Sequence, residues 1–361
     1  MTLIFYILSI ILIVFNLLPM VPNQHWVFRV WDFGRIQLLV LEIIIATLGW
    51  IFLKEHNLYF WIIQALLGAV MIQNLVLLIP YTPLYRLKKR SPGGEANHLL
   101  SSLSVNVYQF NTEYNRLIEL INKEKPDMVF TVESNADWEN ALSVLETEYP
   151  YHHKHSLENT YGMHFYSKLE ITKAQTHFFV ADNIPSFEIE LKSPEGIPFV
   201  FFGVHPPPPS PSEEDTSKER DGDLLAVAKS VKNLNRPVLV MGDFNNVAWA
   251  KSSNLFRRTS GLIDPRRGYG LVSTFHADYR LLRVPIDLLF HSTEIFIEDF
   301  KTLGHIGSDH FPMYCSFYID RNDSSQEAEV EEREEGDKQE AEEMIEEGKR
   351  ETGDRDVIAS E

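Results

Sequence analysis

The sequence of 361 residues has a single cysteine, Cys315, and no excess of basic charge. One cysteine excludes an intrachain disulfide framework. The formal net charge is −18, and residues 91–320 carry −11 of it. Sequence-independent binding of duplex nucleic acid normally needs a basic surface, so the composition disfavours that mode of binding. The charge does not exclude a nuclease, because metal-binding carboxylates account for part of it.

Three apolar stretches of 18, 18 and 22 residues occupy the N-terminal part, namely Leu3–Met20, Ile36–Leu53 and Leu58–Ile79. A signal peptide is the alternative for the first of them, but that stretch lacks a basic n-region and an A-x-A-like cleavage site. Each of the three stretches is near the roughly 20 residues that a helix needs to cross the hydrocarbon core. We therefore predict a membrane domain over residues 1–90 with three transmembrane helices.

Basic residues in the short loops favour one orientation of these helices. With the N-terminus outside, six basic residues lie inside and one, Lys54, lies outside. Lys and Arg accumulate on the cytoplasmic side, so the sequence predicts a multi-pass protein of the cell membrane with a cytoplasmic catalytic domain. Glu42 lies six residues past the start of its span, which favours a place near the headgroups; a functional intramembrane carboxylate is the alternative.

The rest of the chain divides by composition. The Pro- and Gly-containing residues 91–98 indicate a linker. Across residues 99–320, short apolar runs typical of strands alternate with helical apolar spacing, which predicts an α/β domain with helices covering sheets. Residues 321–361 hold seventeen acidic and six basic residues with few large apolar ones, so we predict an acidic tail that is disordered or transiently helical.

The stretch 238–245 is the most informative one. Four apolar residues indicate a buried strand, and Gly242 ends it. Asp243 and Asn245 follow at i and i+2 of an extended segment and so point to the same side. A carboxylate beside a carboxamide could hold a water and a phosphoryl oxygen together. Alone, such a pair is more often an Asx-turn that closes a strand.

Six more polar residues lie at the ends of apolar strands or inside them. They are Asn106, Glu133, His205, Asp287, Asp309 and His310. Taken alone, any one of these residues more often has a structural role, as a helix N-cap, a turn residue or a hydrogen-bonded polar group in the core. Asp287 already needs a partner, because an unpaired buried charge is costly. Together with Asp243 and Asn245 the set reaches eight, which favours one shared site.

This constellation resembles the endonuclease/exonuclease/phosphatase superfamily over about residues 99–319. The most specific matches are Gly242–Asn245 and Ser308–His310, and the stretch from Pro126 to Glu133 is of intermediate strength. The resemblance implies a four-layer α/β/β/α sandwich of the deoxyribonuclease I type, here preceded by three transmembrane helices. It also implies a membrane-anchored member of bacterial type, with the active site at one end of the sandwich.

The resemblance implies a metal site. Glu133 would be the main ligand of Mg²⁺, with Mn²⁺ as an alternative, and Asn106 and Asp309 would complete or support the site. An all-oxygen ligand set suits a hard cation that keeps several waters.

The resemblance also implies catalytic roles. His310 would be the general base or the imidazole that contacts the phosphate, with its tautomer fixed by Asp287, which we favour over Asp309 for this role. Asp243 would position or activate water and Asn245 would hold a phosphoryl oxygen. His205 would contact the phosphate and assist the leaving group.

The sequence also departs from well-known members. A stiff run, Pro206–Pro209, follows His205 and is interpreted as a rigid rim or a loop spacer. The basic DNA-binding loops of abasic-site endonucleases are not visible. Basic residues that could hold a phosphate, with a solvated loop as the alternative, are Arg257, Arg258, Arg266, Arg267, Arg280 and Arg283. Residues 152–155 hold three histidines that fit no strong zinc template and favour a surface loop.

We therefore predict a membrane-tethered, Mg²⁺-dependent phosphoesterase whose partners are a phosphoester substrate and the membrane. No protein partner is predicted. The substrate stays open between nucleic acid and a lipid or small molecule, as in sphingomyelinases or inositol phosphatases. A catalytically silent membrane scaffold and a transporter or sensor that uses Glu42 are alternatives from other classes, and the intact site residues argue against the scaffold.

Overall fold

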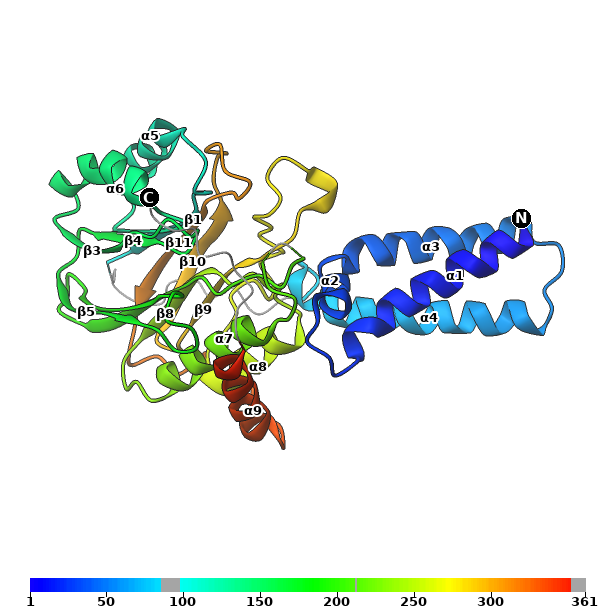
Figure 1. Cartoon of the computed structure of the whole chain (residues 1–361). Helices are drawn as coiled ribbons and strands as arrows, with labels where there is room; N and C mark the ends of the chain where they lie inside the picture. Colours follow the sequence, from blue (N-terminus) through cyan, green and yellow to red (C-terminus); the bar gives the residue numbers. More distant parts are fainter. Residues whose placement is uncertain (86–97, 212, 352–361) are drawn as a thin grey trace.

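A computed structural model describes residues 1–85, 98–211 and 213–351. A bundle of N-terminal helices projects from an α/β sandwich (Figure 1). The expected linker over 91–98 lies outside the described residues apart from His98.

The sandwich is built from two mixed sheets. The larger has six strands in the order β10-β11-β1-β2-β4-β3, and the smaller has five in the order β5-β6-β7-β8-β9. The strands of the larger sheet are β1 (Leu100–Asn106), β2 (Met128–Val132), β3 (Tyr151–His155), β4 (Met163–Ser167), β10 (Ile295–Thr302) and β11 (Met313–Ile319). Those of the smaller are β5 (Ile171–His177), β6 (Ser186–Lys192), β7 (Pro198–Val204), β8 (Val238–Asp243) and β9 (Asp287–His291).

The main core lies between the two sheets. Phe130 of β2, Phe201 of β7 and Met241 of β8 are fully buried there. Neighbouring strand residues point to opposite faces. Val129 and Val240 therefore pack in the outer layers instead. Strands that are buried on both faces must be apolar throughout, which explains the continuous runs in the sequence.

Helices cover both outer faces, so the predicted four-layer α/β/β/α sandwich is confirmed. The larger sheet is covered by α5 (Tyr114–Glu124) and α6 (Ala136–Leu142), and the smaller by α7 (Lys218–Lys232) and α8 (Lys251–Ser260). One local expectation is wrong: residues 152–155 form the edge strand β3, paired with β4, and not a loop. Residues 152–155 of this edge strand are all polar, so β3 lacks the apolar run that identifies the other strands.

Three N-terminal helices are long and apolar enough to cross a membrane, close to the predicted spans. They are α1 (Thr2–Leu17), α3 (Arg35–Phe52) and α4 (Leu58–Leu78), and the short helix α2 (Trp26–Phe33) precedes α3. The N-terminus lies at the end of the bundle remote from the sandwich (Figure 1). Helix α2 could not be predicted from the sequence, because eight residues between two spans offer little periodicity.

Glu42 faces the interior of the helical bundle. It is fully buried, accepts a hydrogen bond from Asn16 at 2.5 Å and lies within 3.3 Å of the Asn74 amide. Polar side chains inside apolar helices stabilise helix pairs when they satisfy one another. A structural role in the bundle therefore accounts for Glu42, and nothing in its contacts points to transport.

The bundle and the sandwich are joined by specific contacts. Trp249 Nε1 donates to the carbonyl of Asp32 at 2.8 Å, and the Tyr81 hydroxyl donates to the carbonyl of Ala248 at 3.1 Å. The backbone N–H of Trp26 donates to the carbonyl of Asp215 at 2.9 Å. Helix α2 is therefore held against the sandwich, although it belongs in sequence to the membrane domain.

The acidic tail folds onto the sandwich, so the expected disorder is wrong for residues 337–350. They form α9 (Asp337–Arg350), which packs across α7 and α8. Ala341, Met344 and Ile345 recur at helical spacing and bury themselves against Leu225 and Leu255. The tail holds few apolar residues, but their spacing puts them on one face.

Charge complementarity fixes the same segment. Arg258 donates two hydrogen bonds to Asp337, at 2.7 and 2.9 Å, and Arg257 pairs with Glu331 at 2.6 Å. Bidentate Arg–carboxylate pairs are the stronger kind of ion pair. Acidic residues of the tail thus help to bind it to the sandwich.

Ile345→Asp is expected to release α9 and to lower the free energy of unfolding by about 2–4 kcal/mol, because a charge would enter an apolar interface. Ile345 is only 6% exposed. Limited trypsin digestion of the full chain would show rapid cleavage after residue 338. Glu346→Asp, on the exposed face of α9, is the matched control. Equal protease resistance of both variants would contradict the docking of α9.

Candidate active site

The eight candidate residues come together at one end of the sandwich. The parallel strands β1 and β2 end there, at Asn106 and just before Glu133. The parallel strands β7 and β8 also end there, just before His205 and at Asp243. Strand β9 runs antiparallel to β8 and begins at the same end, so that Asp287 is the direct pairing partner of Asp243.

A pocket of about 320 Å³ opens at this end. The candidate residues that line it are Asn106, Glu133, His205, Asp243, Asn245, Asp309 and His310. Asp287 lies behind His310 and contacts it directly. The structure thus brings together all eight residues of the strand-end set.

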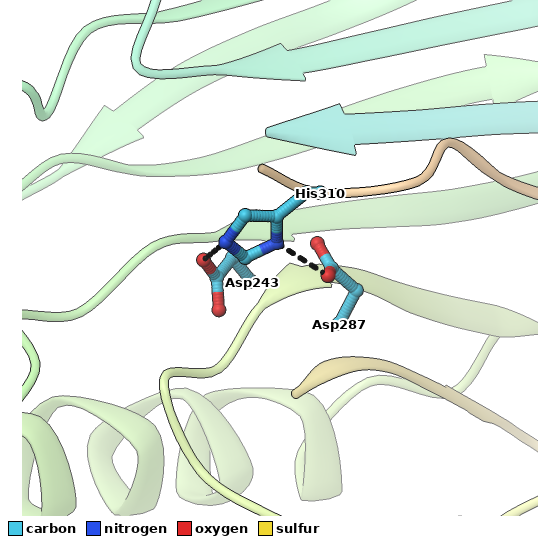
Figure 2. A group of neighbouring side chains, drawn as sticks. All are labelled: Asp243, Asp287 and His310. Atoms are coloured by element: carbon cyan, nitrogen blue, oxygen red, sulfur yellow. Dashed lines mark hydrogen bonds and ion pairs between the residues drawn. The ribbon is translucent and has the colours of Figure 1, made fainter. Parts of the chain in front are cut away.

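His310 is held between two carboxylates (Figure 2). Its Nδ1 lies 2.8 Å from Asp287 Oδ2, and its Nε2 lies 3.6 Å from Asp243 Oδ2. All three side chains are buried. The predicted pairing of Asp287 with His310 is therefore present in the geometry, and it fixes the imidazole so that Nε2 faces the pocket.

Burial and the two carboxylates set the protonation of this group. Burial opposes a charge on His310, but Asp287 and Asp243 outweigh it and raise its pKa to about 10. Burial also raises the pKa of the Asp243 carboxyl, against the opposing effect of His310. His310 is therefore an imidazolium at neutral pH, with Nδ1–H donated to Asp287 and Nε2–H available to an anion.

His205 has a different environment. Its Nε2 lies 3.9 Å from Asp243 Oδ2 and its ring lies 5.3 Å from that of Tyr161. Burial lowers its pKa to about 4, so it is neutral at physiological pH. Its Nδ1 is buried without a hydrogen-bond partner among the described residues. A neutral imidazole can both donate to and accept from a bound phosphate.

Among the described residues, the groups that donate hydrogen bonds to Glu133 are uncharged. It accepts hydrogen bonds from Asn106 Nδ2 at 2.7 Å and from the backbone N–H of Gln109 at 3.2 Å. Asn106 Nδ2 also donates to Asp243 Oδ2 at 3.0 Å. Burial raises the pKa of Glu133 to about 7. Lys and Arg are absent from the described residues that line the pocket, so its carboxylates lack a fixed positive charge other than His310.

Two sets of residues could hold a divalent cation. Asp243, Asp287 and His310 place ligand atoms within 4.8 Å of one another, but a cation there would replace the His310–Asp287 hydrogen bond. Glu133 and Asp309 offer oxygen ligands in the same pocket without that loss. A buried carboxylate with a raised pKa and only amide donors gains most from a cation, so the second set fits a hard cation better.

Asn106 was expected to complete or support the metal site, and its side chain is oriented for support and not for ligation. It presents its NH₂ group to Glu133 and Asp243, while its Oδ1 accepts from the backbone N–H of Tyr108 at 2.9 Å. In this arrangement it supports the two carboxylates, and it would ligate a cation only with the amide turned over.

The backbone at the end of β8 places Asp243 and Asn245. Gly242 has φ +146°, and a Cβ there would lie 2.0 Å from the carbonyl oxygen of Val204 on β7. Only glycine lets the two strands approach this closely. The backbone N–H of Asn245 donates to Asp243 Oδ1 at 2.8 Å, and its side chain donates to the carbonyl of Pro206 at 3.0 Å. The Asx-turn and the site are therefore the same feature.

Several pocket residues were missed by the sequence analysis. Val30 and Phe33 of α2 line the pocket, as do Tyr161, Phe275 and Ile286. No local pattern identifies them, because they are apolar residues brought in from separate elements. Pro208 and Pro209 also line the pocket, which supports the interpretation of the proline run as a rim.

Four basic candidates lie elsewhere, so they are wrong as pocket residues. Arg257 and Arg267 pair with Glu331 of the tail, each at 2.6 Å, and Arg266 pairs with Asp264 at 2.8 Å. Arg258 is bound to the tail as described above. Of the six basic candidates, Arg280 and Arg283 lie on a loop next to the pocket. Phe275, at the base of this loop, lines the pocket.

The two-sheet sandwich with acidic, amide and imidazole groups converging at one end defines a class of phosphoester hydrolases. Residues 103–310 match the Endonuclease/Exonuclease/phosphatase family, and the chain belongs to this family. The protein is accordingly an enzyme of the phosphoester-hydrolase class, as predicted. Among curated proteins, none matches the sequence.

Solved structures show the same fold. The structure of D. rerio TDP2 with a single-strand DNA product superposes with a TM-score of 0.53 at 17% identity, covering 62% of this chain and 100% of that one. An endonuclease/exonuclease/phosphatase family protein from Bacteroides thetaiotaomicron gives 0.52 at 18% identity, covering 63% and 100%. The human Nocturnin catalytic domain with a bound sulfate gives 0.51 at 14% identity, covering 62% and 97%.

Proposed function

We propose that this protein is a membrane-tethered, divalent-metal-dependent hydrolase of phosphoester bonds, with Mg²⁺ as the cation and Mn²⁺ as an alternative. The observation that supports it is the convergence of Glu133, Asp309 and Asp243 with the His310–Asp287 pair in one pocket. The family has this chemistry. The pocket combines carboxylates that could ligate a cation with imidazoles that could contact an anion.

In this proposal, Glu133 and Asp309 hold the cation, and Asn106 keeps Glu133 and Asp243 in place through its amide. When bound, the cation would stabilise negative charge on the phosphoryl oxygens. The raised pKa of Glu133 means that cation binding competes with a proton at neutral pH.

The remaining residues act on the phosphoester and the water. Asp243, whose pKa is raised by burial, orients the water and accepts its proton. His310 donates Nε2–H to a phosphoryl oxygen, while Asp287 keeps its other nitrogen occupied. His205 also contacts the phosphate, and Asn245 supplies a further polar contact. Of the two predicted roles of His310, the phosphate-contacting one is favoured by its pKa.

The tether is the helical bundle. Three apolar helices of spanning length precede the domain, and the N-terminus lies at the bundle's far end. The distribution of basic residues favours a cytoplasmic face for the pocket.

Purified full-length protein in detergent with Mg²⁺ is expected to hydrolyse p-nitrophenyl phosphate or bis(p-nitrophenyl) phosphate, and chelation is expected to abolish the release of p-nitrophenol. A single-stranded oligonucleotide belongs in the same panel, because D. rerio TDP2 was solved with a DNA product. His310→Ala is the negative control. Absence of Mg²⁺-dependent turnover with every member of the panel would contradict the proposal.

A further inference from the structure

The wall of the pocket that faces the membrane domain is apolar. Val30 and Phe33 lie one turn apart on α2 and line the same pocket as Glu133 and His310. Only Gly34 separates α2 from α3, which is long and apolar enough to cross the membrane. The pocket therefore opens at the level where the first turn of a span begins.

A loop connects the pocket with that level. Phe275 lines the pocket, its ring lies 5.0 Å from that of His310, and it pairs with Val284 at the base of the loop 276–283. At the tip, the carbonyl of Leu281 accepts a hydrogen bond from Gln37 Nε2 at 2.7 Å. Gln37 is the third residue of α3, so the tip lies about 3 Å along the span from its start.

The tip of this loop is unusually apolar for a surface in water. Leu281 is 85% exposed and Leu282 is 61% exposed, and Tyr279 is also exposed. Leu84, just past the helix α4, is 85% exposed as well. Large exposed leucines beside a membrane span, with the exposed Arg280 among them, are typical of a segment that enters the lipid interface.

We infer that the substrate of this site is the phosphoester of a lipid in the bilayer that holds the protein's own helices, and that the lipid enters between α2 and the loop 276–283. This rests on the proposed function. The phosphate would reach the polar end of the pocket, and the apolar chain would stay against Val30, Phe33 and the bilayer. The described residues that line the pocket include no Lys or Arg, and the domain is acidic, so the phosphates of a nucleic acid would meet few basic side chains there.

A depth measurement tests the contact of the loop with lipid. The protein's one cysteine, Cys315, is fully buried, so Leu282→Cys gives a single reactive site for a fluorescent label. In phosphatidylcholine proteoliposomes, spin-labelled lipids are expected to quench this label. A label at Val144→Cys, on a 61% exposed position of the 3-10 helix Ser143–Thr147 that follows α6, is expected to stay unquenched. Equal quenching at both positions, or none at position 282, would overturn the placement.

An activity comparison tests the substrate class. Full-length protein is assayed on mixed micelles that contain phosphatidic acid or phosphatidylglycerol, on p-nitrophenyl esters and on a single-stranded oligonucleotide. Replacing both leucines with aspartate (Leu281→Asp with Leu282→Asp) is expected to lower turnover of the lipid at least tenfold while leaving turnover of the p-nitrophenyl esters unchanged. Val144→Asp is expected to change neither.

The outcomes separate the two proposals. Turnover of soluble esters without turnover of either lipid, or preferred turnover of the oligonucleotide, would overturn the lipid inference and leave the phosphoesterase standing. Equal losses on lipid and soluble ester in the leucine variant would also overturn it, because the loop would then act on folding or chemistry. Absence of any His310-dependent turnover would refute the proposed function itself.

Discussion

His310→Ala is expected to lower kcat/KM for the best phosphoester by about 10³-fold, within the range measured for single acid–base groups. The imidazolium is the only cationic group among the described residues that line the pocket. Its removal takes away the donor that meets the phosphoryl oxygen, and the loss should fall on kcat because this contact strengthens as charge develops in the transition state.

Asp287→Asn provides the second arm of a double-mutant cycle. The carboxamide keeps an oxygen for the Nδ1–H of His310 but removes the charge. If Asp287 acts only through His310, its variant should lose less, about 10- to 100-fold, and the double variant should be no worse than His310→Ala alone. Strictly additive losses would instead give Asp287 a separate role.

The pH dependence of Asp287→Asn distinguishes positioning from a structural effect. The Asp287 carboxylate helps to raise the pKa of His310 to about 10. A donor is lost as pH rises through its pKa, so the high-pH limb of kcat/KM should move to lower pH in Asp287→Asn. An activity that rises with pH through this range would show that His310 works as a base. His152→Ala, on the edge strand β3, is the matched control, with circular dichroism to confirm folding of every variant.

The sequence was sufficient to predict the polar end of the sandwich, because each of its residues follows or interrupts an apolar run. Asp243 and Glu133 could be found from strand ends alone, and parallel neighbouring strands bring such ends together. The pairing of Asp287 with His310 needed the resemblance as well, since 23 residues separate them.

The apolar parts of the pocket could not be found in this way. Val30 and Phe33 lie more than 70 residues before Asn106 and resemble any other residues near a membrane span. Arg257 and Arg258 are plausible phosphate ligands by sequence, but in the structure they form ion pairs with acidic residues of the tail. Charge alone does not reveal which partner a residue meets, and only the packing of α9 on α8 decides it.

Glu133→Gln is expected to raise the Mg²⁺ concentration needed for half-maximal activity by about 100-fold, and to leave part of the activity at saturating Mg²⁺. Glutamine keeps the shape of the side chain and the acceptor for Asn106, but it removes the anionic oxygen. Glu170→Gln, an exposed carboxylate outside the pocket, is the matched control. Titration of the metal-free protein with Mn²⁺, followed by electron paramagnetic resonance, measures the same loss without reference to turnover.

The same substitution is expected to stabilise the metal-free protein, which separates a metal site from a structural carboxylate. Burial raises the pKa of Glu133 from 4.5 to about 7, so the folded state disfavours its charge. A carboxyl with a raised pKa destabilises the fold above that pKa, and the penalty disappears as pH falls below the unfolded value. Glu133→Gln should therefore raise the free energy of unfolding by up to about 3 kcal/mol above pH 7, reduced by about 1 kcal/mol for the Gln109 hydrogen bond.

Thermal unfolding of both proteins with chelator and with saturating Mg²⁺ completes the test. With chelator at pH 8, Glu133→Gln should unfold at the higher temperature, and near pH 4 the two midpoints should converge. With Mg²⁺ the order of the two unfolding temperatures should reverse. A ligand at free concentration c that binds only the folded state stabilises it by RT ln(1 + c/Kd), and the wild type binds Mg²⁺ more tightly. A wild type that is insensitive to Mg²⁺, or a Glu133→Gln variant that is less stable under every condition, would rule out Glu133 as the principal metal ligand.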